Sequence, residues 1–453
     1  MASSAERFVP PHPPRGSAPV AVWRGFFGER ARTAVYGWSE RAFELDYMRR
    51  NVLGYTVHIP LDPDMIQHVL LDNAANYVKP DLVKKLLERT IGRGLLSSDG
   101  ELWRAQRKIV AASFAPAAVD AAIPAFAAAA GSIAGTWSAG SRDMAAEATA
   151  TTKRIIADTL FAGDTRLTSR ASMDHIAAAL EGVSEARLQL LLGLPLVPWS
   201  LRGWRAHRGQ RFLRGTLEQL VRDRLADTSV DDFLALLIRA LRERFPPDEA
   251  IALAVDNGAT FYLAGHETTA NALTWSLFLL AEQPELQDEA AAEARSALAV
   301  PADADLPDRL PLLRRILDET LRLYPSAPRF DRQALADDRL GEHEVRAGEL
   351  VSIWPWIVHR HKRLWEDPDA FLPERFAPGA PERHRFQYLP FGGGPRVCVG
   401  ARFATAEALT ILAQWLSQWR FAPAAGRVVR ASGMVTLRPA GGLPLGISRR
   451  SSG

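Results

Sequence analysis

The feature that most constrains the fold is a long helical stretch without an internal proline, between Pro247 and Pro284. Most of its residues are apolar, and Pro246 and Pro247 mark its start. The pattern predicts a helix from about residue 247 to residue 282. At a rise of about 1.5 Å per residue, such a helix is about 50 Å long, more than the diameter of a small domain. It must therefore pass through the middle of the protein, with the rest of the chain folded around it.

Helical patterns dominate residues 30–325, where alanine- and leucine-rich segments show no fixed-period repeat. Strand patterns near residues 52–60 and 349–354, one or two hairpins within 332–354, and a hairpin that turns at Gly441 and Gly442 add a minor β part. The 453-residue sequence therefore predicts a mainly α protein with a minor β part, folded as a single large domain over residues 21–453. Residues 1–20 hold five prolines and no apolar run, and are interpreted as a flexible N-terminal arm.

The charge balance limits the classes of function that the chain can have. The formal net charge is +3, from 55 basic and 52 acidic residues, which argues against a nucleic-acid-binding protein. It leaves room for a local basic face that docks an acidic partner. No segment resembles a signal peptide, and no run approaches the roughly 18–20 apolar residues of a transmembrane anchor. We therefore expect a cytoplasmic protein.

The single cysteine, Cys398, excludes an intramolecular disulfide and a cysteine-rich zinc site. It lies in the segment FGGGPRVCVG, residues 391–400, directly before a good helix-forming sequence. A helix N-terminus and the nearby Arg396 both favour a thiolate, the form of cysteine that binds metal ions. Glycines allow the backbone to approach a flat molecule closely. The alternative is a buried structural cysteine beside a glycine-rich turn.

Glu319 and Arg322 lie in LLRRILDETLRLYP, where leucine and isoleucine recur with helical spacing until Pro325. Residues three apart on a helix share a face and can form an ion pair. Without further context, an exposed pair of this kind would be common and would contribute little stability.

The long central helix contains AGHETT at residues 264–269. Phe261, Ala264 and Thr268 fall on one face with Glu267 beside it, and Gly265 makes local widening of the helix easy. The alternative is a threonine-containing core helix with an exposed glutamate. A third pattern places Trp103 and Arg107 one turn apart, where both could bind a carboxylate; an amphipathic surface helix would give the same spacing.

Residues 391–400 resemble the haem-binding loop of the cytochrome P450 superfamily, Phe-x-x-Gly-x-Arg-x-Cys-x-Gly, at every fixed position. The resemblance implies a haem-thiolate monooxygenase with non-covalent heme b, iron protoporphyrin IX, as its cofactor. Cys398 would be the ligand of the iron and Arg396 would pair with a haem propionate. Phe391 would pack beside the thiolate, and Gly400 completes the cofactor-binding loop.

The other motifs are similar to those of the same family and occur in its order. The resemblance implies that Glu319, Arg322 and Arg375 form a structural cluster, and that Glu267 and Thr268 relay protons to dioxygen. It also implies three more cofactor-binding positions, whose side chains would hold haem propionates: Trp103, Arg107 and Arg332.

The resemblance also indicates where the substrate would bind. The pocket residues that it implies are apolar or small: Phe261, Ala264, Ala327, Pro328, Phe330, Met434 and Val435. They favour a small lipophilic substrate, such as a fatty acid, terpenoid or carotenoid, that is hydroxylated or epoxidised. The apolar run 188–204 would line its entrance or touch a membrane surface through Trp199 and Trp204, or simply pack between two helices.

The chain extends about fifty residues past Cys398, too short for a fused reductase domain. We therefore expect electrons from a separate ferredoxin or flavodoxin, docked near the cysteine loop. Two other functions remain alternatives: a peroxide-driven peroxygenase, which would not need Glu267 and Thr268, and a haem-binding sensor or carrier without turnover.

Overall fold

The computed structural model describes residues 7–17, 33–52, 54–169, 175, 197–198, 200–433 and 435–451. The chain forms two compact units. Unit 1 comprises residues 1–78, 119–151 and 267–453, and unit 2 comprises residues 79–118 and 152–266. The described elements are mainly helices with small sheets, which confirms the predicted fold class.

The largest sheet of unit 1 has five strands in the order β1-β2-β8-β5-β3. Strands β1 (Tyr47–Val52) and β2 (Tyr55–Pro60) form an antiparallel hairpin, and β2 pairs in parallel with β8 (Leu350–Ile353). Strand β5 (Phe330–Ala334) runs antiparallel to β8 and to β3 (Tyr77–Val78). Between β5 and β8 lies the hairpin β6 (Asp338–Leu340) and β7 (His343–Val345). Strands predicted near 52–60 and 349–354 are therefore present.

The C-terminal strands correct one prediction. Strand β10 (Ala431–Ser432) pairs with β11 (Arg438–Pro439). Strand β12 (Pro444–Arg449) pairs instead with β9 (Trp419–Pro423) and β4 (Gly140–Asp143). Gly441 and Gly442 therefore connect two sheets, and the predicted hairpin at that turn is wrong.

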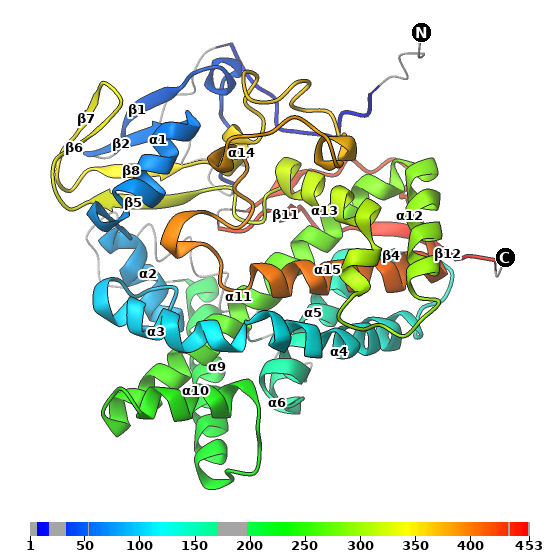
Figure 1. Cartoon of the computed structure of the whole chain (residues 1–453), viewed down its shortest axis with the longest axis horizontal. Helices are drawn as coiled ribbons and strands as arrows, with labels where there is room; N and C mark the ends of the chain where they lie inside the picture. The colour runs from blue at the N-terminus through cyan, green and yellow to red at the C-terminus, as the bar shows by residue number, and fades with distance from the viewer. Residues whose placement is uncertain are drawn as a thin grey trace. The chain divides into compact units, whose positions relative to one another are not determined.

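The helices of unit 1 pack around α15 (Ala401–Gln418). It contacts α12 (Pro284–Ala297) and α13 (Pro311–Leu323), which also contact each other (Figure 1). Helix α4 (Pro116–Ala134) packs on α15 as well, because the rings of Phe126 and Phe403 lie 4.8 Å apart. The short helices α1 (Pro63–Gln67) and α14 (Pro355–Val358) lie beside the sheet strands in sequence.

Helix α4 is relevant to the prediction that the chain has no transmembrane anchor. Among the described residues it is the one helix that is long and apolar enough, by composition, to cross a membrane. Asp120 is its single charged residue, so the sequence does contain a run of nearly the required length. Helices of a protein core pass the same test, and the Trp415 indole of α15 donates a hydrogen bond to the Ala130 carbonyl at 3.3 Å.

The described part of the N-terminal arm makes specific contacts with unit 1. Arg15 donates two hydrogen bonds to Asp369, at 2.8 and 2.5 Å, and its side chain is 6% exposed. The Tyr324 hydroxyl donates to the Pro11 carbonyl at 2.8 Å, and the Phe371 amide donates to the Phe8 carbonyl at 3.0 Å. Residues 7–17 of the predicted flexible arm are therefore fastened to the unit.

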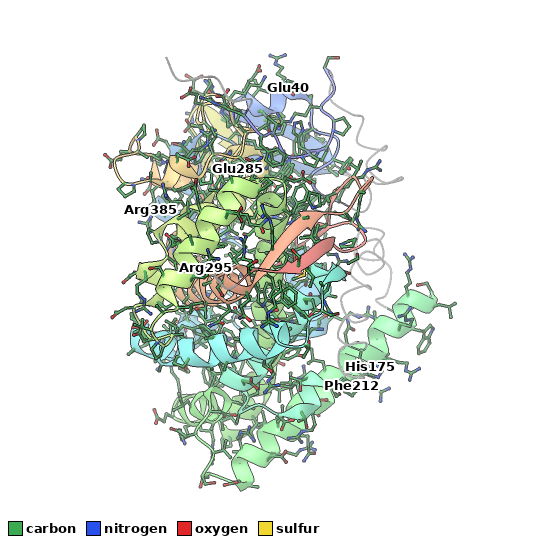
Figure 2. The ribbon with its side chains drawn as sticks, turned by 90° about the vertical axis from the view of Figure 1, so that its right-hand side faces the viewer. Glu40, His175, Phe212, Glu285, Arg295 and Arg385 are labelled. Atoms are coloured by element: carbon green, nitrogen blue, oxygen red, sulfur yellow. The ribbon has the colours of Figure 1, made fainter. Side chains whose placement is uncertain are left out.

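Unit 2 is helical in its described part. It contains α2 (Asp81–Ile91), α3 (Gly100–Ser113), α6 (Thr165–Thr168), α9 (Leu201–Ala226) and α10 (Phe233–Arg242), and it shares α5 (Met144–Leu160) with unit 1. Helix α10 contacts α3 and α9. Figure 2 shows Phe212 of α9 next to His175. The two rings stack, with their centroids 4.6 Å apart.

The predicted central helix is α11 (Pro247–Ala281), which begins and ends within a residue or so of the sequence-based bounds. Its residues 247–266 belong to unit 2 and its residues 267–281 to unit 1. Residues 253–263 and 269–281 are all buried, as expected for a helix through a protein core. Ala264, by contrast, is exposed, and Gly265, Glu267 and Thr268 are half-exposed. One turn in the middle of α11 therefore presents an accessible face.

Candidate active site

The cysteine loop is a closed turn that carries the thiol outward. The Cys398 amide donates to the Phe391 carbonyl at 3.0 Å, and the Val397 amide donates to the Gly394 carbonyl at 3.1 Å. Cys398 lies two residues before Gly400, the residue that caps α15, so it adjoins the helix N-terminus as predicted. Its side chain is exposed.

Two of the three glycines have a backbone conformation that other residues rarely adopt. Gly392 has φ +73° and Gly394 has φ +65°. Gly394 also packs against the backbone of a wide helical turn, His68–Asp72, where the Leu70 carbonyl fills the space of a would-be Cβ atom. At Gly393, a Cβ atom would lie 2.8 Å from the Phe386 ring. The loop therefore needs glycine for its shape and for its contacts.

Glu319 and Arg322 of α13 form a fully buried ion pair. The guanidinium donates to both carboxylate oxygens, at 2.6 and 2.7 Å, and neither side chain is exposed. The remaining donors of Arg322 reach the backbone carbonyls of His359, Pro368 and Ala370, at 2.6 to 2.9 Å. Buried charges need this degree of hydrogen bonding to offset their lost hydration. The pair thus ties α13 to the segment that leads to the cysteine loop.

Arg375 is the third member of this cluster. It lies in the short helical turn Pro373–Phe376, with its Nε 3.4 Å from a carboxylate oxygen of Glu319. The same oxygen accepts a hydrogen bond from the Leu372 amide at 2.9 Å. The structure therefore brings together the three residues that the resemblance groups.

His359 links this cluster to the cysteine loop and is not visible from the sequence motifs. Its Nε2 accepts a hydrogen bond from the Leu389 amide at 2.7 Å, so its Nδ1 donates to the Arg322 carbonyl at 3.2 Å. Burial lowers the pKa of His359 to about 3, and the nearby Arg322 acts in the same direction. The imidazole is thus neutral and fixes the position of Leu389, two residues before Phe391.

The accessible turn of α11 is hydrogen-bonded to two other segments of unit 1. The Ser326 hydroxyl, just after α13, donates to the Thr268 carbonyl at 2.9 Å. Thr436, between β10 and β11, donates its hydroxyl proton to Glu267 at 2.7 Å. These contacts place Ala327 and Val435 near Glu267 and Thr268. Ala327 is exposed, and Val435 is 57% exposed.

The sequence suggests that Gly265 allows α11 to widen locally, but in the structure Gly265 has a different role. Helix α11 stays α-helical through residues 264–269. A Cβ atom at residue 265 would lie 2.7 Å from Cδ1 of Ile156 in α5, so glycine allows the close approach of this helix in unit 2. The Thr152 hydroxyl of α5 also donates to the His266 carbonyl at 3.0 Å.

The other implied pocket residues differ in exposure. Phe330 is half-exposed, whereas Pro328 is buried. Phe261 is 7% exposed and lies 5.4 Å from Phe114 and 5.2 Å from Phe233, ring to ring, in an aromatic cluster of unit 2. Met434 lies outside the described residues.

The implied propionate partners lie in both units. In unit 2, Trp103 and Arg107 are half-buried and one turn apart on α3. Gln106 of the same helix is fully buried and accepts a 2.6 Å hydrogen bond from Asn257 of α11. In unit 1, Arg396 is half-buried in the cysteine loop, and Arg332 of β5 is 9% exposed with a 3.0 Å hydrogen bond to the Asp331 carbonyl.

Glu407 is a buried carboxyl that the motifs did not single out. It lies on α15, nine residues after Cys398, and is 0% exposed. Burial raises its pKa well above the ordinary value and so favours the neutral carboxyl. A lone acidic residue within the apolar run of α15 was the available signal for a buried carboxyl.

Comparisons with known proteins agree with this geometry. The family model of cytochrome P450 matches residues 45–440. Cyclooctatin synthase of Streptomyces melanosporofaciens is 32% identical, over 84% of this chain and 84% of its own length. Cytochrome P450 714C3 of Oryza sativa subsp. japonica is 30% identical, over 85% of this chain and 78% of its own length. Protein LUTEIN DEFICIENT 5, chloroplastic, of Arabidopsis thaliana is 29% identical, over 86% and 70%.

The chain belongs to the cytochrome P450 family. It is a haem-thiolate monooxygenase whose cofactor is heme b, and it requires a substrate, dioxygen and a redox partner. The described residues fit a haem. Cys398 is exposed in the cysteine loop, and α11 presents an exposed alanine and a half-exposed glycine at its central turn.

Proposed function

We propose that this enzyme inserts one oxygen atom of dioxygen into a C–H or C=C bond of a small lipophilic substrate, by hydroxylation or epoxidation. Residues 21–453 would act as one haem-binding domain. The observation that carries the proposal is the accessible turn of α11. Between the buried stretches 253–263 and 269–281 of this helix, an acid and an alcohol, Glu267 and Thr268, are half-exposed.

Cys398 would bind the haem iron as a thiolate, which the adjoining N-terminus of α15 and Arg396 favour. When bound, haem supplies the chemistry that activates dioxygen, and its thiolate ligand favours cleavage of the O–O bond. Phe391 and Gly400 would shape the loop around the thiolate. The propionates would pair with the nitrogen donors of Trp103, Arg107, Arg332 and Arg396.

Glu267 and Thr268 would deliver protons to the reaction. The Thr268 hydroxyl can accept a proton from one side and donate one to the other, with water as the intermediary. The carboxyl of Glu267 would exchange protons with solvent, since its side chain is 20% exposed. A peroxygenase or a sensor would have no use for this pair.

The side chains around the accessible turn support a lipophilic substrate. Ala264, Ala327 and Val435 are exposed, and Phe330 is half-exposed. Apolar walls of this kind bind a ligand mainly by removing its apolar surface from water. Met434, Phe261 and Pro328 belong to the same proposal, although the last two are nearly or fully buried.

A separate ferredoxin or flavodoxin would supply the electrons. Arg385, which Figure 2 labels, is exposed six residues before Phe391. Arg402, four residues after Cys398, is exposed and pairs with Asp120 at 2.8 Å. Basic groups beside the cysteine loop would attract an acidic donor protein and speed its docking. A diffusing donor of this type fits the proposed cytoplasmic location.

The start of α9 would make a weak contact with a membrane surface. Leu201 is 86% exposed and Trp204 is 56% exposed. Four arginines of the same helix are also exposed and form no ion pair with other described residues: Arg202, Arg205, Arg208 and Arg211. Exposed tryptophan and leucine with arginine are typical of helices that lie on anionic membranes. Trp199 and residues 188–196 of the apolar run lie outside the described residues.

Two variants test the proposed function. Cys398→Ser should abolish the red-shifted Soret band that the reduced carbon monoxide complex of a thiolate-bound haem gives; its survival would show that another residue binds the iron. Thr268→Ala should consume reductant without forming product. Full coupling in that variant would contradict the proton relay, and a search for low-to-high-spin shifts with lipophilic compounds would identify the substrate.

A further inference from the structure

Two residues of the hairpin formed by β10 and β11 hold the carboxylate of Glu267. The Thr436 hydroxyl donates to its Oε1 at 2.7 Å, and an Arg438 guanidinium nitrogen lies 3.7 Å from the same oxygen. Both residues lie in unit 1, in and beside the link between β10 and β11. A hydrogen bond to a charged acceptor is stronger than one between neutral groups, so Thr436 favours one orientation of the carboxylate.

The link that carries Thr436 is itself fixed to α11. The Leu437 amide donates to the Ser326 carbonyl at 3.0 Å, and the Trp275 indole of α11 donates to the Leu437 carbonyl at 3.1 Å. On its other side, Gly433 packs against the Thr436 carbonyl too closely for any side chain. The backbone of Thr436 is therefore held on both sides, and its hydroxyl has a defined position relative to Glu267.

Arg438 differs from Thr436 in its exposure. Its side chain is 61% exposed, whereas that of Glu267 is 20% exposed. The Arg438 side chain is therefore mostly in contact with solvent, while the Glu267 side chain is largely covered. The attraction between the two side chains is modest, because water screens exposed ion pairs.

We propose that Thr436 and Arg438 are positioning residues for proton delivery, which hold Glu267 in the orientation that takes up protons from solvent. This inference rests on the proposed function of Glu267. In each cycle the carboxylate gains a proton from solvent and passes one on toward Thr268, so its own charge is restored.

Four variants separate positioning from simple support of the hairpin. Thr436→Val keeps the shape and removes the donor, while Thr436→Ser keeps the donor. Arg438→Gln removes the charge next to Glu267. The matched control is Arg427→Gln, because Arg427 is exposed and bonds the carbonyls of residues 440–442 without contact to Glu267.

Dioxygen consumption by the holoenzyme is measured in H2O and D2O, with reduced flavodoxin as donor and dodecanoic acid as probe. Thr436→Val and Arg438→Gln should slow consumption at least threefold and raise the solvent isotope effect. Thr436→Ser and Arg427→Gln should stay within twofold of the unmodified enzyme. Equal rates in Thr436→Val and Arg427→Gln would overturn the proposal.

A second measurement does not depend on turnover. The unfolding constants of Thr436→Val, Glu267→Gln and the double variant form a cycle that isolates the interaction of the two side chains. We expect a non-additive change of at least threefold. Additive changes would overturn the proposal. If the cycle is non-additive but the Thr268→Ala variant stays fully coupled, the contact between Thr436 and Glu267 stands. In that case the proposed proton relay through Glu267 and Thr268 is rejected.

Discussion

The Leu70 carbonyl oxygen occupies the space that a Cβ atom at residue 394 would need. Gly394→Ala must therefore push the cysteine loop away from the His68–Asp72 turn and also pay the strain of a positive φ. We expect a loss of about 2–4 kcal/mol in unfolding free energy and poor haem retention. Gly392→Ala is the control, because its φ is similarly positive but nothing lies within 4 Å of its would-be Cβ. Equal effects in urea unfolding would contradict the packing argument.

The buried pair of Glu319 and Arg322 should be far more sensitive than a surface pair. Glu319→Gln leaves the Arg322 charge buried without its counter-ion, which typically costs about 3–5 kcal/mol. Glu344→Gln removes a partner of Arg346 from a pair whose side chains are 62% and 61% exposed, and should change the unfolding free energy far less. Chemical denaturation of both variants measures the difference. Similar losses would mean that the buried cluster contributes no special stability.

Glu407 should make the folded protein less stable as pH rises. Its raised pKa keeps a proton on the folded carboxyl, while the unfolded chain releases that proton above its ordinary value of 4.5. Unfolding therefore becomes easier by about 1.4 kcal/mol per pH unit until the folded carboxyl also ionises. Glu407→Gln should remove this slope, so its gain in stability grows as the pH rises above 4.5. The exposed Glu289→Gln is the control, and an unchanged slope in Glu407→Gln would refute the assignment.

Two buried histidines should destabilise the protein in acid. Burial lowers the pKa of His359 to about 3 and that of His266 to about 4. Above the ordinary value of 6.5 both states are neutral; below it only the unfolded chain takes up the protons. Each histidine should therefore lower the unfolding free energy by about 1.4 kcal/mol per pH unit between pH 6.5 and pH 4. His266→Asn, which can still donate to the Tyr262 carbonyl, should reduce this slope, whereas His207→Asn should leave it unchanged.

The start of α9 should bind anionic membranes. Sedimentation with vesicles that contain an anionic phospholipid should capture the protein, and zwitterionic vesicles should not. Replacing the four exposed arginines with glutamine should weaken binding by about 1 kcal/mol per residue, and Trp204→Ala should weaken it further. Binding that ignores lipid charge, or that survives both changes, would exclude this surface.

Sequence patterns over a few residues were sufficient to predict the elements whose structure depends mainly on neighbouring residues. Helix α11 follows its flanking prolines and apolar pattern, because both act within a few residues. The pair of Glu319 and Arg322 follows from helical spacing. The motifs also identified the cysteine loop, because its glycines are needed for the loop's own backbone conformation and for the backbone that packs against it.

Contacts between distant segments left no comparable signal. Strand β12 pairs with β4, about three hundred residues earlier in the chain. The sequence of β4, GSRD, lacks the alternation of apolar and polar residues that predicts a strand. The hydrogen bond from Thr436 to Glu267 spans 169 residues and leaves no mark in either local pattern. Arg15 likewise lies in a proline-rich stretch, where nothing in the sequence indicates its bond to Asp369.

The chain has one cysteine, and its side chain is exposed at the end of the glycine turn. A thiol reagent can therefore react at a single position. If iron ligation masks that sulfur, the number of titratable thiols per chain equals the fraction of molecules that lack the cofactor. Titration of this one thiol would then measure the cofactor content of any preparation of the enzyme.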